Sequence, residues 1–317
     1  MIPPSPAHAA ASPSGGLGLR TAAVGYLIVI LVIPLATVVL DAFRGPKPRT
    51  VVTTERAINA AGIEIEREVE REIPQPWSPS AALAEFGRSL TRPAARAALA
   101  LSLWTAAVMT VINAVFGTLT AYVLVRYRFP GRALLNALID LPFAIPTLVT
   151  GVMLVILYGP QTALGQLLGT AWDWPIIFAP PGIILALLFV CYPLVVRTVQ
   201  PVLDAVDRSQ EEAALTLGAT PWQTFRRVVL PAVWPAVASG ALLAFARALG
   251  EFGSIVVVAG NIPMYTQTAA VYVFGEIESD NRIGASGMAV ALMALSFTLV
   301  LAVDRLQRAR RRRTAHG

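Results

Sequence analysis

The chain has 317 residues and a net charge of +6; 56% of its residues are hydrophobic and only 14% are charged. A soluble domain carries roughly 25% charged residues because its surface faces water, so this composition, with a mean hydropathy of +0.64, predicts an integral membrane protein. The single lysine, Lys47, lies between two prolines and so excludes a Gly-Lys-Ser/Thr nucleotide-binding loop. The two histidines, His8 and His316, lie at opposite ends of the chain, which excludes a His-based zinc site. Because Cys191 is the single cysteine, the chain cannot form an intrachain disulfide.

Residues 1–20 are rich in proline, alanine, serine and glycine, a composition that predicts a disordered segment. Six apolar runs follow, each long enough to cross a bilayer at about 20 residues per crossing. They cover residues 22–43, 97–125, 134–158, 180–200, 235–258 and 284–303. We therefore expect an all-α integral membrane protein with six transmembrane helices, the first within 21–43 and the other five in a core over 97–303.

The distribution of arginine predicts the sidedness of these helices. With both termini in the cytoplasm, the inner segments are rich in arginine, whereas the outer segment 159–179 has none and 259–283 has only Arg282. The outer loop 44–96 also carries arginines, but long polar loops cross the membrane largely regardless of charge. The basic tail 304–317 then lies in the cytoplasm, where we expect it to contact anionic lipid head groups rather than nucleic acid.

The outer loop contains a charged insertion whose sequence is compatible with two structures. Ile65, Val69 and Ile73 recur every four residues, which predicts a short helix with an apolar stripe. Ile63 and Ile65 also alternate with glutamates, which is typical of a strand. The insertion is either a solvated segment with local salt bridges or a contact surface for an external partner.

The segment 197–234 is long for a loop between spans and has the pattern of two short helices. Glu211 and Glu212 form an acidic first turn, and Gly218 provides a C-cap. Thr220-Pro221 then predicts the start of a second helix. The apolar face of this second helix comprises Trp222, Phe225, Val228 and Val229.

The spacing of residues in this segment resembles the EAA loop of ABC-importer permeases. Glu212-Ala-Ala is followed after three residues by Gly218, and after nine more by Val228-Val-Leu-Pro231. In that family the loop forms a coupling helix that docks into a groove on the ATP-binding subunit. The resemblance implies an ATPase-coupling role for Glu211, Glu212, Ala213, Ala214, Gly218, Ala219, Pro221, Leu230 and Pro231.

The resemblance extends over roughly residues 80–303. The segments that resemble sulfate/thiosulfate importer permeases are 125–132, 140–146, 196–201, 217–226 and 247–253. Ala259-Gly-Asn-Ile-Pro-Met264 is similar to the T-type subunit of that importer, and the molybdate permease shares much of the pattern. The insertion 45–76 departs from the family, whose first outer loop is shorter and less charged.

The resemblance also implies partners, a location and alternatives. The chain is expected to form half of a two-permease pore in the bacterial inner membrane, with a W-type permease and two copies of an ATP-binding subunit. A periplasmic or extracellular sulfate-binding protein is expected to deliver the anion. Molybdate or tungstate, which resemble sulfate in shape and charge, are the alternative substrates. An ion-coupled secondary transporter is the alternative mechanism, and it predicts inverted repeats and midspan ionisable groups instead of a helical cytoplasmic loop.

Arg247, Glu251 and Asp140 are charged residues within predicted spans, where charge is costly and marks function. Arg247 and Glu251 are four residues apart on one helix face, as either a structural ion pair or a positive charge that lines the path of an anion. Asp140 precedes Pro142 and Pro146, which are expected to break the helix. This break is interpreted either as a gate or as a kink required for packing. The sequence shows neither paired carboxylates nor a nucleophile–base pair, so we expect no catalytic site, no metal site and no cofactor.

Overall fold

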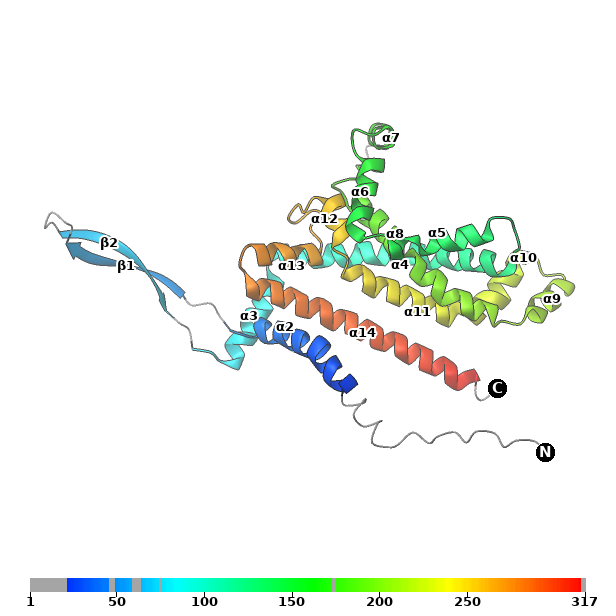
Figure 1. The fold of residues 1–317 in the computed structure, drawn as a ribbon, viewed down its shortest axis with the longest axis horizontal. Helices are drawn as coiled ribbons and strands as arrows, with labels where there is room; N and C mark the ends of the chain where they lie inside the picture. The colour runs from blue at the N-terminus through cyan, green and yellow to red at the C-terminus, as the bar shows by residue number, and fades with distance from the viewer. Residues whose placement is uncertain (1–21, 46–48, 59–63, 74–75, 173–174, 315–317) are drawn as a thin grey trace, which may run out of the picture. The chain divides into compact units, whose positions relative to one another are not determined.

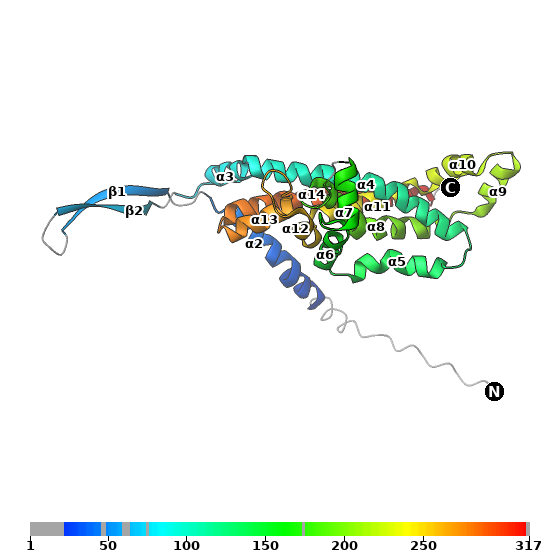
Figure 2. The ribbon, with the colours of Figure 1, turned by 90° about the horizontal axis from the view of Figure 1, so that it is seen from above.

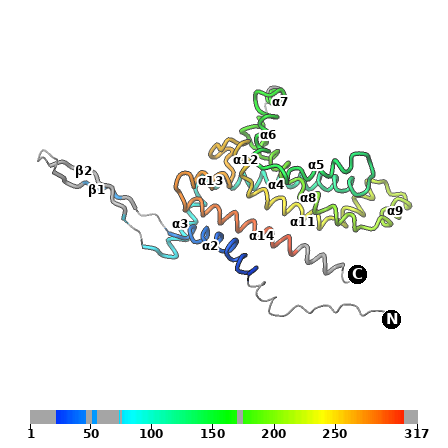
Figure 3. The backbone as a smooth tube through the Cα atoms, in the orientation of Figure 1, coloured from blue at the N-terminus to red at the C-terminus, as the bar shows by residue number. Residues whose placement is uncertain are grey.

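The computed structural model describes residues 22–45, 49–58, 64–73, 76–172 and 175–314 (Figure 1), and the course of the backbone is mostly helical (Figure 3). The predicted disordered segment 1–20 lies outside the described residues. The chain divides into two compact units, Met1–Glu85 and Phe86–Gly317. Among the described residues, five helices are long and apolar enough to span a membrane, or six if one bent pair counts as a single span.

The first unit begins with an apolar helix over Ala22–Ala42, which matches the first predicted span. It contains a π-helical turn, η1 (Ile28–Val32), followed by α2 (Ile33–Ala42). Pro34 has no amide hydrogen, so the carbonyl four residues earlier lacks its usual donor, and the helix widens at this point. Most of its side chains are exposed, which suits a helix surrounded by lipid.

The charged insertion forms a two-stranded antiparallel hairpin. β1 (Arg49–Ile58) pairs with β2 (Glu64–Ile73) in a register that runs from Arg49↔Ile73 to Ile58↔Glu64. β-Branched residues in β1 and the alternating pattern of β2 favour extended backbone. The strand interpretation of this segment is therefore confirmed and the helical one is wrong. The mostly helical fold includes this one hairpin among the residues that the structure describes.

Four long helices build the second unit: α4 (Pro93–Arg126), α8 (Pro180–Asp204), α11 (Leu230–Leu249) and α14 (Arg282–Thr314). α8 packs against α4 and α11, and α11 also packs against α14 (Figures 1 and 2). Met109, Ile183 and Val195 are among the fully buried side chains of this core. The predicted spans 97–125, 180–200 and 284–303 lie within α4, α8 and α14.

Shorter elements lie before and between the long helices. They are α3 (Pro79–Thr91), α5 (Arg132–Ala144), α6 (Thr147–Tyr158), α7 (Ala163–Trp172), α9 (Arg208–Thr216), α10 (Pro221–Thr224), the π-helical turn η2 (Phe225–Val229), α12 (Gly253–Ala259) and α13 (Ala269–Glu278). α9 and α10 lie at one end of the second unit, toward which α14 also runs, and α13 lies at the opposite end (Figures 1 and 2).

Two predicted spans are broken. The run 134–158 comprises α5 and α6, which meet at an angle of 111°. Pro146 has no amide hydrogen and holds Ile145 in an extended conformation, so the proline pattern predicted this break correctly, although Pro142 lies inside α5. The run 235–258 was expected to be continuous, and this expectation is wrong because α11 ends at Leu249 and α12 begins only at Gly253.

Small residues set the distance between the long helices. A Cβ atom at Gly117 of α4 would lie 3.0 Å from Cβ of Val195 on α8, and one at Gly240 of α11 would lie 3.1 Å from the Val195 Cα. In lipid, helices associate through such close packing because burial of apolar surface gives them no advantage. α8 therefore contacts both neighbours almost backbone to backbone.

Replacing Gly240 with leucine should destabilise the helix bundle, because the new side chain would push α11 away from α8. Overpacking of this kind costs about 1–3 kcal/mol. We expect a lower melting temperature of the purified protein and less of it in membranes. The matched control is Gly169→Leu, since a Cβ there would meet no atom within 4 Å. Equal stability of the two variants would contradict the packing argument.

Candidate functional site

The predicted coupling segment folds as two short helices, α9 and α10. The Asp207 carboxylate caps the N-terminus of α9 by accepting hydrogen bonds from the Ser209 backbone N–H at 3.0 Å and the Ser209 hydroxyl at 2.7 Å. These two hydrogen bonds hold the pKa of Asp207 below its usual value because both stabilise the carboxylate, and the bond from the Ser209 hydroxyl has the larger effect. The polar residues before the helix therefore fix where it begins.

Gly218 ends α9 in the way that the sequence predicts. It has a φ of +84°, and its N–H donates to the Leu215 carbonyl at 2.9 Å. The Ala219 N–H donates to the Ala214 carbonyl at 3.0 Å, which completes a Schellman C-cap. Thr220 and Gln223 then form a capping box that starts α10. These caps make the turn between the two helices rigid.

The Leu230-Pro231 pair shapes the entry into α11. Because Pro231 has no amide hydrogen, the carbonyl four residues before it lacks a helical donor. The backbone widens there into η2, where the Leu230 N–H bonds to the Phe225 carbonyl instead. Leu230 is half-buried and Pro231 is exposed, so this pair shapes the helix below the loop.

The tip of the loop is exposed and carries both small and apolar side chains. Its exposed residues include Glu212, Ala213, Gly218 and Pro221. Leu217 is 89% exposed. Trp222 is also exposed, and its ring stacks on that of Phe225 with the two ring centroids 5.6 Å apart. Phe225 itself is buried. The predicted apolar face of the second helix is thus divided: Phe225 packs in the protein interior, and Trp222 remains on the surface, where the stacked ring of Phe225 supports it.

Glu211 differs from the rest of the predicted coupling residues because it points inward. Its carboxylate forms an ion pair with Arg126 at 2.6 Å, and the two side chains are 12% and 8% exposed. The hydroxyl of Tyr122 also donates to Glu211, at 3.5 Å. Arg126 was not among the residues predicted to act in coupling; its position directly after the predicted span 97–125 was the available signal.

Asp140 also has a partner that was not predicted from the sequence. Arg197 of α8 donates from Nε and Nη2 to the two carboxylate oxygens of Asp140 on α5, at 2.7 and 2.6 Å. The same guanidinium donates to the Asn136 and Gln200 side-chain oxygens at 3.2 and 2.6 Å. Arg197 lies within the predicted span 180–200, so its charge was a signal that a partner should exist. The pair ties α5 to α8.

Arg247 and Glu251 form an ion pair of 2.7 Å across the break between α11 and α12. The Glu251 side chain is only 2% exposed, and it also accepts hydrogen bonds from the N–H and hydroxyl of Ser254 at 3.1 and 3.0 Å. Arg247 is 42% exposed and therefore also presents its charge outside the pair. Two readings of Arg247, structural pairing and lining of a path, are compatible with this geometry.

The exposed part of Arg247 borders a cavity of about 150 Å³. The residues that line it with Arg247 come mainly from the break between α5 and α6 and from α8: Pro142, Phe143, Ile145, Thr147, Val190 and Leu194. The break between α5 and α6 and the Arg247 side chain, two residues before the end of α11, therefore meet at this cavity. Such an arrangement suits the brief stay of an anion, because the positive charge is accessible while its countercharge is buried.

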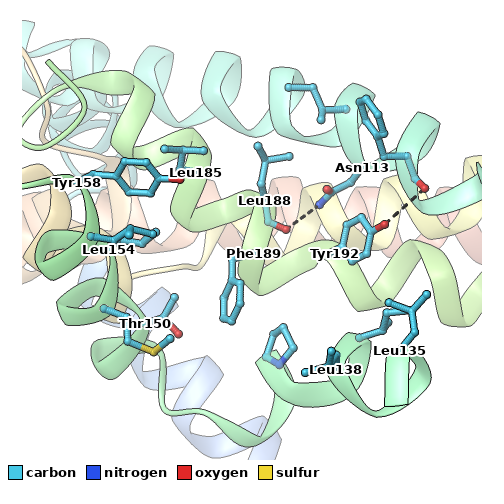
Figure 4. Close-up of a pocket in the computed structure, with 16 residues that line it drawn as sticks. Asn113, Leu135, Leu138, Thr150, Leu154, Tyr158, Leu185, Leu188, Phe189 and Tyr192 are labelled. Carbon is cyan, nitrogen blue, oxygen red and sulfur yellow. Dashed lines mark hydrogen bonds between the residues drawn. The ribbon is translucent and has the colours of Figure 1, made fainter. Parts of the chain in front are cut away.

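A larger cavity of about 730 Å³ lies between α4, α5, α6 and α8 (Figure 4). Its walls are mostly apolar, with Leu138, Leu154 and Phe189 pointing into it. Asn113 donates to the Leu188 carbonyl at 3.3 Å, so its amide belongs to the packing of α4 on α8. An apolar occupant fits this cavity better than an anion does. Within the described residues, no group of three His, Cys, Asp or Glu side chains could hold a metal ion.

Comparison with known proteins establishes the family. Residues 113–316 match the binding-protein-dependent transport system inner membrane components. The chain belongs to this family. The permease is 45% identical over 219 residues to the probable sulfate transport system permease protein CysT of Chlorella vulgaris. The matched region covers 68% of this chain and 82% of the Chlorella protein. The permease is 42% identical over 224 residues to CysT of Escherichia coli strain K12, over 71% and 80% of the two chains.

The fold of the permease is also that of a solved transporter. A bacterial ABC transporter involved in the import of alginate superposes with a TM-score of 0.68, over 92% of this chain and 94% of that one. The sequence identity is 14%, so this likeness concerns the fold alone. The permease is thus a multi-pass membrane component of a transporter, and the roles of its individual residues stay predictions.

Removing Arg247 should destabilise the permease more than neutralising Glu251. Arg247→Met leaves a buried carboxylate with only Ser254 as partner, whereas Glu251→Gln leaves a guanidinium that reaches solvent. The expected cost of Arg247→Met is roughly 1–2 kcal/mol, once solvent screening of the half-exposed arginine is allowed for. Thermal unfolding of the purified protein measures this, and the double variant should recover most of the loss. Equal effects of the two single substitutions would argue against the buried-charge account.

Proposed function

We propose that this permease moves sulfate, and with it thiosulfate, through the inner membrane of a bacterium as one subunit of an ATP-driven importer. The observation that carries the proposal is its identity of 42–45% to CysT proteins over at least 80% of their length. The permease has no nucleotide-binding loop of its own, so ATP hydrolysis belongs to a partner chain. Both of its termini are proposed to lie in the cytoplasm.

The proposed partners of the permease are two copies of an ATP-binding subunit, a second permease of the W type, and a periplasmic sulfate-binding protein. The exposed tip around Gly218 and Leu217 supports docking to an ATP-binding subunit, because it is firm and presents an apolar surface to solvent. A second solved structure of similar fold is a bacterial alginate ABC transporter in complex with an alginate pentasaccharide-bound periplasmic protein. Membrane lipid would cover the remaining apolar surface.

The proposed mechanism is alternating access. When ATP closes the ATPase dimer, α9 and α10 carry the movement into the spans, which rock between inward-facing and outward-facing states. The anion passes the breaks of α5–α6 and α11–α12, where Arg247 offers positive charge. Because Glu251 balances that charge from the buried side, the anion is held weakly enough to leave. Selectivity rests mainly with the binding protein.

Radiolabelled sulfate uptake tests the proposal. It is measured in cells that lack the gene and in the complemented strain, with excess unlabelled thiosulfate or molybdate as competitors. We expect uptake that depends on the gene and is blocked by thiosulfate. Sulfate uptake unchanged by the deletion, with molybdate accumulation lost instead, would contradict sulfate as the substrate and leave a permease for another tetrahedral dianion.

Gly218→Leu should uncouple ATP hydrolysis from uptake, because a branched side chain at the tip would obstruct docking. We expect transported sulfate per ATP to fall by about tenfold while the protein still inserts in the membrane. The control is Gly131→Leu: Gly131 also has a positive φ, of +88°, and a Cβ at either glycine meets no atom within 4 Å. The backbone strain is thus matched. Equal transport by the two variants would contradict the docking role of Gly218.

A further inference from the structure

The two adjacent glutamates at the start of α9 occupy different environments. Glu212 is exposed, whereas Glu211 is held against Arg126 at the last residue of α4, with both side chains of that pair close to buried. A buried ion pair is little screened by salt, and removing one partner leaves the other charge stranded. The Arg126–Glu211 contact is therefore a firm connection between the loop and a long membrane helix.

Two further hydrogen bonds strengthen this connection in a reciprocal way. Arg126 donates from Nη2 to the carbonyl of Val206, just before α9, at 3.1 Å. Arg208, the first residue of α9, donates from Nη2 to the carbonyl of Val125 on α4, also at 3.1 Å. Each arginine thus bonds to the backbone of the other's segment. Tyr122, whose hydroxyl reaches Glu211, also packs its ring on Phe225 of η2 at 5.0 Å.

Apolar burial does little to hold α9. No residue of α9 is buried, so the hydrophobic effect gives this helix little attachment to the rest of the protein. α9 also contacts η2, and its polar contacts with the end of α4 attach it directly to a long membrane helix. A helix held only by its chain connections would tilt under a push from outside and would not transmit it.

We propose that the Arg126–Glu211 pair, with the two backbone bonds beside it, makes α9 and the C-terminal end of α4 move as one body, so that α4 is the span that first receives the movement of the ATPase. Arg126 and Glu211 are positioning residues in this account, and Glu212 belongs to the docking surface. The inference rests on the proposed function, because it assigns a route to the coupling that the function requires.

The first test measures sulfate accumulation and ATP hydrolysis in the same proteoliposomes, which hold the complete transporter and enclose ATP. Glu211→Gln keeps the size of the side chain and removes its charge; we expect sulfate per ATP to fall at least about fivefold. Co-purification with the ATP-binding subunit should be unchanged, whereas Glu212→Gln should weaken it. Exchanging the charges, Arg126→Glu with Glu211→Arg, should restore most of the ratio.

The matched control is Arg128→Ala, which removes an exposed arginine two residues beyond Arg126. We expect it to leave the ratio of sulfate to ATP unchanged. A normal ratio in Glu211→Gln, or a loss in Arg128→Ala equal to that in Glu211→Gln, would overturn the inference. Wild-type complex that hydrolyses ATP and accumulates no sulfate would instead contradict the proposed function.

A second test measures the distance between α9 and the segment that follows α4, and it does not require a transport assay. Spin labels at Arg128→Cys and Gln210→Cys, in a Cys191→Ala background, report the separation between the segment after α4 and α9. Both labelled positions are exposed. We expect the same distance in nucleotide-free and ATP-bound complex, and a shifted or broader distribution once Glu211→Gln is added. A wild-type distance that changes with nucleotide would overturn the inference.

Discussion

The structure depends on one constraint: the hydrocarbon core of a bilayer offers no water to backbone amides and carbonyls. A continuous helix such as α4, whose only proline lies in its first turn, satisfies these groups internally. Broken backbone at Ile145–Pro146 and Gly250–Phe252 is tolerated because α6 and α12 pack closely, through Gly151 against Ser254 and Gly253 against Thr147. The Glu251 carboxylate accepts from the free amide of Ser254 at the start of α12. The group that satisfies the break is thus the same group that pairs with Arg247.

The features of the fold that follow from local chemistry could be predicted from the sequence. The ends of α9 and α10 are encoded by a glycine with positive φ and by Thr220-Pro221, all within a few residues of the element they define. The break at Pro146 follows from a missing amide hydrogen. The break at Gly250–Phe252 contains no proline, and the apolar segments on both sides of it together have the pattern of one continuous span. For this reason it could not be predicted from the sequence.

Features that depend on contacts between distant segments could not be predicted. The pairs Arg126–Glu211 and Arg197–Asp140 join helices far apart in the chain, and one sequence does not show which helix faces which. For the same reason, the two neighbouring glutamates looked equivalent although one is paired inside and one is exposed. The hairpin was ambiguous because Ile65, Val69 and Ile73 recur every four residues while Ile63 and Ile65 alternate with glutamates, and the pairing of 64–73 with β1 decides between the two patterns.

The most direct test of the account is ATP-driven sulfate accumulation by the purified complex in proteoliposomes, with ion gradients collapsed by ionophores and a sulfate-binding protein outside. The account predicts that labelled sulfate accumulates against its gradient only when hydrolysable ATP is enclosed, and that it stops with a non-hydrolysable analogue. Accumulation that follows an imposed ion gradient and ignores ATP would contradict it, because the α9–α10 loop would then have no ATPase to couple.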